Sequence, residues 1–175
     1  MVNIEEQSDF ISGNKSSKEI IDCHSRENAI FSGAISAIPG PAGILTMIPE
    51  LIFVVKTKVK MINALGRFYG QESFFNKEIL IGMLLLGKGM KTSLFDVEGS
   101  EVRIKKGSPD IFKSQIMEFT NGISKEMLEK SFVKMMPVAS SISMLAWARK
   151  ATQKTGAVAV NIFQKKLKRV EQLAS

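Results

Sequence analysis

Hydrophobic and polar residues alternate along most of this chain with the spacing of amphipathic helices. Ser16 and Glu19 have the spacing of a capping box, which predicts that a first helix starts there and covers about 16–37. A second helix is expected over about 47–69, and Gly70 can end it. Its expected buried stripe advances by three or four residues, at Leu51, Val55, Val59, Ile62, Leu65 and Tyr69.

The longest stretch without a charge runs from Asn28 to Pro49. Its 22 residues are long enough to cross a bilayer. Pro39 and Pro41 lie at its centre, and proline breaks a continuous helix because it lacks an amide donor and collides with the preceding turn. We therefore expect two short helices joined by a turn. Such an apolar hairpin could be buried in a core or enter one leaflet, and the sequence leaves both interpretations open.

Residues 79–86 are apolar on every side of a helix and are expected to form a central helix. Residues 93–108 lose the helical period, which predicts a short irregular or β-hairpin-like insert. Further helices are expected, with breaks after 120, at 136–137 and near 149–151, and the last of them covers 152–173. The sequence thus predicts an all-α fold: a compact bundle of six or seven helices around the Pro/Gly-broken hairpin. It would form a single domain over 16–175, preceded by a flexible tail at 1–15.

The chain of 175 residues is both basic and apolar, with 24 Lys and Arg against 17 Asp and Glu, a net charge of +7, and 45% hydrophobic residues. This composition excludes a disordered chain, a collagen-like repeat and a disulfide scaffold. Cys23 is the single cysteine, which fits a reducing compartment. One cysteine and one histidine are too few for a Cys/His zinc cluster, so we expect no metal and no cofactor.

Two sequence patterns could carry chemistry, but a structural role explains each of them better. Gly82–Lys88 fits the first seven positions of a phosphate-binding loop, but Gly89 stands where the magnesium-binding hydroxyl is needed and no strand precedes it. Cys23 and His24 are adjacent, and neighbours on a helix point about 100 degrees apart, so the imidazole is badly placed to activate the thiol. A hydrolase that uses Cys23 or Ser25 is therefore disfavoured, and we expect neither enzymatic activity nor a small-molecule substrate.

Basic side chains gather on two predicted helix faces. One lies on the outer side of 47–69 and the other lies away from the apolar seam of 152–173: Lys56, Lys60 and Arg67, then Lys165, Lys168 and Arg169. Between Arg149 and Ser175, seven basic residues oppose Glu171, a balance of +6. Basic amphipathic helices suit an anionic membrane surface or an acidic protein. Nucleic acid is disfavoured because one Trp and one Tyr offer little surface for base stacking.

Residues 18–70 resemble the EcsC family of bacterial proteins, in His24-Ser25-Arg26, in AISAIPGPAG at 34–43 and in the ending Phe68-Tyr69-Gly70. The segments 128–141 and 155–157 are similar to the closing helices of that family, so the resemblance covers about two thirds of the chain. It implies a helical protein that is associated in places with ABC-transporter operons or membranes and whose activity is undefined. It supplies no active-site residues.

Two functional hypotheses follow from these patterns. The first is a non-enzymatic accessory protein, cytoplasmic or peripheral at the inner face of the plasma membrane, that uses the two basic faces at the membrane surface or with a membrane or transport partner. The second is a soluble protein-interaction module, such as an immunity or inhibitor protein, that binds an acidic partner. The acidic start of the chain, with Glu5, Glu6 and Asp9, does not resemble a secretion signal.

Overall fold

The structure, a computed structural model, describes residues 16–38, 45–92, 94–105, 109–134 and 139–170. The expected tail and the expected turn at Pro39 and Pro41 lie outside these residues. The described chain is mostly helical, in agreement with the all-α prediction. Its elements are α2 (Ser17–Ser36), α4 (Met47–Phe68), the 3-10 turn η1 (Glu72–Phe74), α5 (Lys77–Gly87), β1 (Phe95–Glu98), β2 (Glu101–Lys105), α6 (Pro109–Lys134), α7 (Ala139–Phe163) and β3 (Lys166–Val170).

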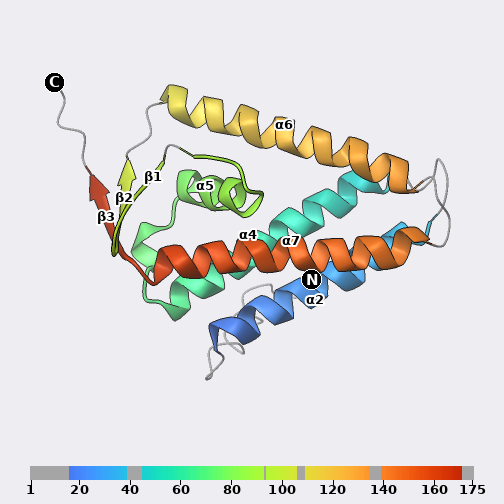
Figure 1. The fold of residues 1–175 in the computed structure, drawn as a ribbon, viewed down its shortest axis with the longest axis horizontal. Helices are drawn as coiled ribbons and strands as arrows, with labels where there is room; N and C mark the ends of the chain where they lie inside the picture. The colour runs from blue at the N-terminus through green and yellow to red at the C-terminus, as the bar shows by residue number, and fades with distance from the viewer. Residues whose placement is uncertain (1–15, 39–44, 93, 106–108, 135–138, 171–175) are drawn as a thin grey trace, which may run out of the picture.

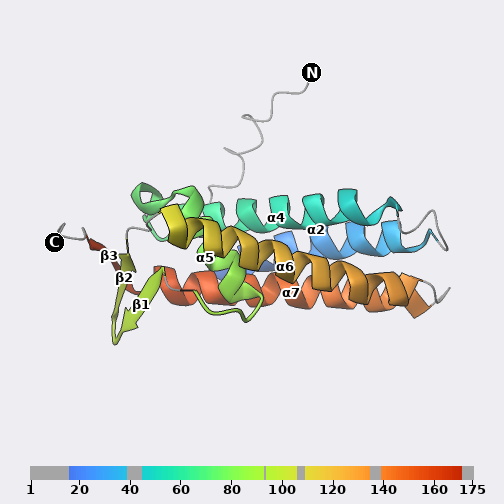
Figure 2. The ribbon, with the colours of Figure 1, turned by 90° about the horizontal axis from the view of Figure 1, so that it is seen from above.

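Three long helices, α2, α4 and α7, pack against one another, and α5 packs against α7 and α6 (Figures 1 and 2). The small sheet lies at one end of the bundle, here named the sheet end (Figure 1). The C-terminal end of α2 and the N-terminal ends of α4 and α7 gather at the opposite end. Because α2 runs opposite in direction to both neighbours, its late residues lie level with the early residues of α4 and α7.

Local signals set several of the helix boundaries. The capping box at α2 is confirmed: Ser16 Oγ accepts a hydrogen bond from the Glu19 amide at 3.3 Å, and Glu19 Oε2 accepts one from the Ser16 amide at 2.8 Å. The expected end of α4 is confirmed at Gly70, whose φ of 66° is a left-handed conformation that favours glycine. Ahead of α5, Asn76 Oδ1 accepts from the Ile79 amide at 2.8 Å.

The buried face of α4 is rotated relative to the predicted stripe. Ile62 and Leu65 are buried as expected, whereas Leu51, Val55 and Val59 are only partly buried. Two of the buried positions, Glu50 and Lys58, are charged. The buried residues of α4 are Met47, Glu50, Val54, Thr57, Lys58, Met61, Ile62, Leu65 and Gly66. Nearly every residue in the first half of α4 is apolar, so hydrophobicity alone does not define which side of this half faces inward.

Two of the expected breaks between helices are absent, which leaves five α-helices in the described residues where six or seven were predicted. Asn121-Gly122 lies inside α6, and residues 149–151 lie inside α7. A β-carbon on Gly122 would lie 3.0 Å from the Met90 sulfur, so this glycine allows a close approach and does not end the helix. Neither glycine nor proline occurs at 149–151 to interrupt α7.

The predicted insert is confirmed as a hairpin, in which β1 and β2 pair antiparallel around a turn with Gly99 at a φ of 55°. The predicted helix over 152–173 is wrong at 166–170: α7 ends at Phe163, and residues 166–170 form β3, which pairs parallel to β2. Residues 171–173 of the predicted helix lie outside the described ones. Leu167 lies beside Val102 in this register. The hairpin leaves one edge of β2 with unpaired backbone groups, and pairing with the returning chain satisfies them.

The main hydrophobic core lies in the half of the bundle that is nearer the sheet. It unites side chains from four helices and the hairpin: Ile20, Met61, Ile62, Leu65, Ile79, Met83, Leu84, Val102, Ile104, Ala159, Ile162 and Phe163. The predicted central helix is confirmed in α5, where Ile79, Met83 and Leu85 are almost completely buried. Gly87 lets α5 approach α7, since a β-carbon there would lie 2.9 Å from Thr155 Cα.

Candidate functional site

The outer face of α4 carries the first of the two predicted basic surfaces. Lys56, Lys60 and Arg67 are all exposed, as the sequence pattern predicted for this side of the helix. At 1.5 Å per residue, they extend over about 17 Å of the helix. The face is set by the packing of the opposite side of α4, where Met61 and Leu65 enter the main core. We name these three cations the basic face of α4.

The same exposed side of α4 becomes apolar toward its N-terminal end. Ile48 and Ile52 are 59% and 50% exposed, and they precede Lys56 at intervals of four residues along one face. Leu45, just before the helix, is 80% exposed. One face of one helix therefore carries large aliphatic side chains at its start and cations farther along.

The neighbouring helices add further exposed aliphatic side chains at the same end. Phe31 of α2 stacks on Phe53 of α4 at 3.7 Å between ring centroids, and Leu145 of α7 lies close to Gly33 of α2. These contacts bring the three helices to one level of the bundle. We name the exposed aliphatic side chains at this end the apolar tip: Ile30, Ile38, Leu45, Ile48, Ile52, Ile142 and Leu145.

Charged side chains are nearly absent from the segments that form the apolar tip. Residues 28–38, 45–55 and 142–148 contain one charged residue, Glu50, and it is fully buried in the first turn of α4. A carboxylate in the first turn of a helix is favoured by the helix dipole. Large exposed apolar patches on protein surfaces mark sites that bind protein, ligand or membrane.

The interior beneath the apolar tip contains buried polar side chains beside buried apolar ones such as Met47. Asn28 of α2 is fully buried and donates a hydrogen bond from Nδ2 to Thr152 Oγ1 of α7 at 2.8 Å. Ser32 and Ser36 follow on the same side of α2, and both are buried. Within the described residues, Asn28 Oδ1 and Ser32 Oγ are buried without a hydrogen-bond partner. The buried side of α2 near the tip thus carries polar and small side chains, whereas aliphatic side chains are exposed around it.

The second predicted basic surface is not a helix face. Lys165 follows the end of α7 and is partly buried, while Lys168 and Arg169 belong to strand β3. The side chains of Lys168 and Arg169 lie outside the described ones. Because β3 pairs with β2, successive side chains alternate between the two faces of the sheet, so the expected common helical side for these three cations does not exist.

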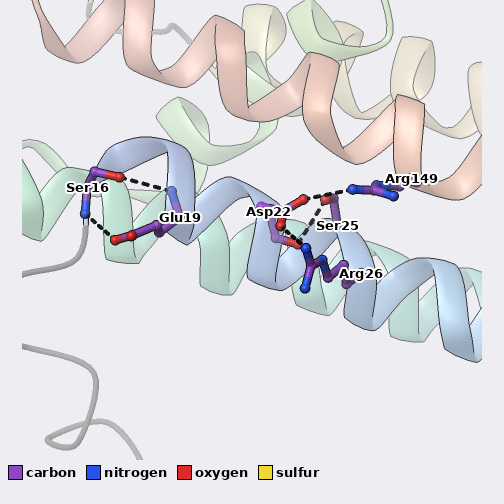
Figure 3. A network of polar contacts seen from close by, with 6 residues as sticks. All are labelled: Ser16, Glu19, Asp22, Ser25, Arg26 and Arg149. Carbon is purple, nitrogen blue, oxygen red and sulfur yellow. Dashed lines mark hydrogen bonds and ion pairs between the residues drawn. The ribbon is translucent and has the colours of Figure 1, made fainter.

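A charged network joins α2 to α7 near the middle of the bundle (Figure 3). Asp22 accepts from Arg149 Nη2 at 2.9 Å and from Arg26 Nη2 at 2.9 Å, one carboxylate oxygen serving each guanidinium. Ser25 Oγ donates to the Asp22 carbonyl at 3.0 Å. All three charged groups are partly exposed, so the network orients the two helices and contributes little to stability.

A groove of about 740 Å³ lies beside this network, between the first turns of α2 and the last turns of α7. Its lining mixes both signs of charge with amides and small apolar groups: Ser17, Lys18, Glu19, Ile21, Asp22, Gln153, Ala157, Val160, Asn161 and Gln164. This mixture does not point to one class of ligand.

Neither of the two patterns that could carry chemistry forms a reactive site in the described part of the chain. The Gly82–Lys88 pattern falls within and just after helix α5, where Gly82 and Gly87 are buried in packing contacts. Cys23 is exposed, while His24 Nδ1 lies 3.4 Å from Glu27 Oε2. Among the residues that the structure describes, no three His, Cys, Asp or Glu side chains gather closely enough to hold a metal ion.

Comparison with known proteins adds no relative: no family model, no curated protein and no solved structure matches this chain. The resemblance to the EcsC family stays a prediction. None of the helices in the described part of the chain combines the length and hydropathy that crossing a bilayer requires.

Sequence reasoning found the basic face of α4 but missed most of the apolar tip. It identified the charge-free hairpin at 28–49 without deciding whether the hairpin is buried. It also overlooked the contribution of Ile142 and Leu145. A signal for these two residues was present in the sequence, since residues 139–148 contain no charge.

Proposed function

We propose that this protein is a non-enzymatic accessory protein that associates with an anionic membrane surface through basic side chains. The observation that carries the proposal is the exposed face of α4. Along this face the aliphatic side chains of Ile48 and Ile52 are followed by the cations Lys56, Lys60 and Arg67. Each cation near an anionic surface adds about 1 kcal/mol of attraction. Lys165, Lys168 and Arg169 add positive charge near the sheet end by their sequence positions.

The proposed site of action is the inner face of the plasma membrane, alone or beside a membrane or transport protein. The resemblance to the EcsC family is in keeping with this location. The competing proposal is a soluble module that binds an acidic protein, for which the same basic face of α4 would serve. The two proposals differ in whether lipid alone suffices for binding.

Co-sedimentation with vesicles tests the proposal. We expect the full chain to pellet with vesicles that contain anionic phospholipid, to pellet less with neutral vesicles, and to be released as salt is raised. The double variant Lys56→Glu/Lys60→Glu should bind anionic vesicles at least about thirtyfold more weakly, since two cations are lost and two like charges are introduced.

The matched control is Lys113→Glu/Lys125→Glu, which makes the same change of net charge at exposed positions on α6. Equal weakening by both double variants would mean that net charge, and not the basic face of α4, drives binding. No pelleting with either vesicle would refute the membrane role and favour the acidic protein partner.

A further inference from the structure

The apolar tip has a cation behind it on each of the three long helices. Arg26 on α2 lies four residues before Ile30, Lys56 on α4 lies four residues after Ile52, and Lys150 on α7 lies five residues after Leu145. Because α2 runs opposite to the other two helices (Figure 1), each cation lies between the tip residues of its own helix and the sheet end. All three are exposed, and we name them the cationic collar.

We propose that the apolar tip inserts into the acyl region of a bilayer while the cationic collar stays at the headgroups, so that the bundle stands end-on in one leaflet. This inference rests on the proposed function and adds the inserting element and its orientation. In that orientation Lys56 and Lys60 are the members of the basic face of α4 nearest the headgroups, and Arg67, about 17 Å from Lys56 along the helix, stays in water. The helix rise places Ile52 about 6 Å and Ile48 about 12 Å beyond Lys56 along α4. Those offsets match a headgroup layer some 5–7 Å thick with hydrocarbon beneath it.

The distribution of polarity across the tip fits a lipid surrounding. On α2 at this level, Asn28 and Ser32 are buried whereas Ile30 is exposed. Ile48 on α4 and Ile142 on α7 are exposed as well. In water this arrangement exposes aliphatic surface. In a bilayer the aliphatic side chains contact acyl chains, while polar side chains and the Glu50 carboxylate stay covered by protein.

Charge argues for lipid over a second copy of the chain as the occupant of this surface. Two tips that met end to end would leave both cationic collars in water without opposite charges, since the offset of about 12 Å from Lys56 to Ile48 in each copy keeps the collars roughly 24 Å apart. Glu27, exposed beside Arg26, and Asp22, paired with it at 2.9 Å, offset only the α2 part of the collar. Anionic headgroups around an inserted tip would instead face cations on all three helices.

Labelling at single cysteines tests the depth of insertion in the full chain. The native Cys23 is exposed on α2, about 10 Å from Ile30 along the helix on the sheet side of the collar, so a label there should stay in water. In a Cys23→Ser background, Ile48→Cys and Ile142→Cys place the same environment-sensitive fluorophore in the tip. We expect a blue shift and quenching by lipids brominated on the acyl chains at both tip positions, and neither effect at Cys23.

A binding measurement complements the labels. Ile48→Ser/Ile52→Ser should weaken binding to anionic vesicles about tenfold or more, because aliphatic surface no longer leaves water. The matched control Ile116→Ser/Met117→Ser removes two exposed apolar side chains from α6 and should leave binding within about twofold. Because Ile48 and Ile52 are exposed, both double variants should retain the unfolding transition of the parent chain.

The outcomes separate this inference from the proposed function. If the protein pellets with anionic vesicles but the tip labels are not quenched, the basic face of α4 binds at the surface and the insertion is refuted. If nothing pellets, both proposals fail. A blue shift at the tip without vesicles, together with concentration-dependent dimers in sedimentation velocity, would show that a second copy covers the tip and would overturn the insertion.

Discussion

At the sheet end, the interior is hydrophobic and tightly packed, with Met61, Leu65 and Met83 completely buried among residues of α5, α7 and the hairpin. At the opposite end, Asn28 and Ser32 are buried beside apolar side chains such as Met47, and aliphatic side chains form the apolar tip on the surface. Both ends are built from the same three long helices. The difference shows that one helix can supply a hydrophobic core at one end and an exposed apolar surface at the other.

The largest expected effect is loss of aliphatic volume at the sheet end. Leu65→Ala should lower the free energy of unfolding by about 2–5 kcal/mol, because a fully buried side chain is removed and a cavity is left. Ile48→Ala at the apolar tip should change it by less than about 0.5 kcal/mol. Urea titration followed by circular dichroism measures both values, and similar losses for the two variants would contradict the comparison.

Glycine substitutions compare how closely the helices approach at the two ends. A β-carbon at Gly87 would lie 2.5 Å from Thr155 Oγ1 and 2.9 Å from Thr155 Cα, so Gly87→Ala should cost about 1–3 kcal/mol. At Gly33 the nearest atoms of Leu145 would be 3.4 Å away, which is ordinary contact. Gly33→Ala should therefore raise stability by up to about 1 kcal/mol through helix propensity. Thermal unfolding of both variants checks the opposite signs, and a loss at Gly33 would show that α2 and α7 are as closely packed there.

The buried polar side chains of α2 near the tip predict another pair of opposite signs. Asn28→Ala should cost about 1–2 kcal/mol, because it removes the buried hydrogen bond to Thr152 Oγ1. Ser32→Ala should raise stability by up to about 1 kcal/mol, since its buried hydroxyl has no hydrogen-bond partner among the described residues. Denaturant midpoints of the two variants at matched slopes provide the measurement. Destabilisation by Ser32→Ala would mean that its hydroxyl has a bound water or another partner.

The smallest effect is expected where the two regions meet, in the network of Asp22 and Arg149. A double-mutant cycle with Asp22→Asn and Arg149→Gln should give a coupling of about 0.2–1 kcal/mol at low salt, because both groups are partly exposed. Raising the salt concentration should reduce that coupling. The exposed pair of Arg103 and Glu98, at 3.2 Å, serves as a second cycle with an equal or smaller value. A coupling unaffected by salt would contradict this view of the network.

The sequence predicted those features of the fold that depend on neighbouring residues. The capping box at Ser16, the end of α4 at Gly70 and the hairpin around Gly99 are confirmed, because each needs only a few residues to specify it. The expected break at Gly122 is wrong, because that glycine serves the approach of Met90, a residue far away in the sequence. A glycine required for packing and a glycine that ends a helix look alike in one sequence.

Features that depend on distant partners were not predictable in the same way. Residues 166–170 have apolar side chains at a spacing that a helix also allows, and only the open edge of β2 makes them a strand. The basic face of α4 was predicted because its cations recur at helical spacing. The apolar tip was not resolved, because exposure of Ile48 and Ile142 depends on how the helices pack and not on composition.

The pairing of α2 with α7 also has a consequence for synthesis on the ribosome. Asn28 and its partner Thr152 are 124 residues apart, so α2 leaves the ribosome roughly 6–25 s before α7 can cover it, at about 5–20 residues per second. During that interval α4 can already pack against α2, through contacts such as Phe31 with Phe53, but the side of α2 that α7 covers stays open. Nascent chains at this stage are therefore the form most open to chaperones or to a nearby bilayer.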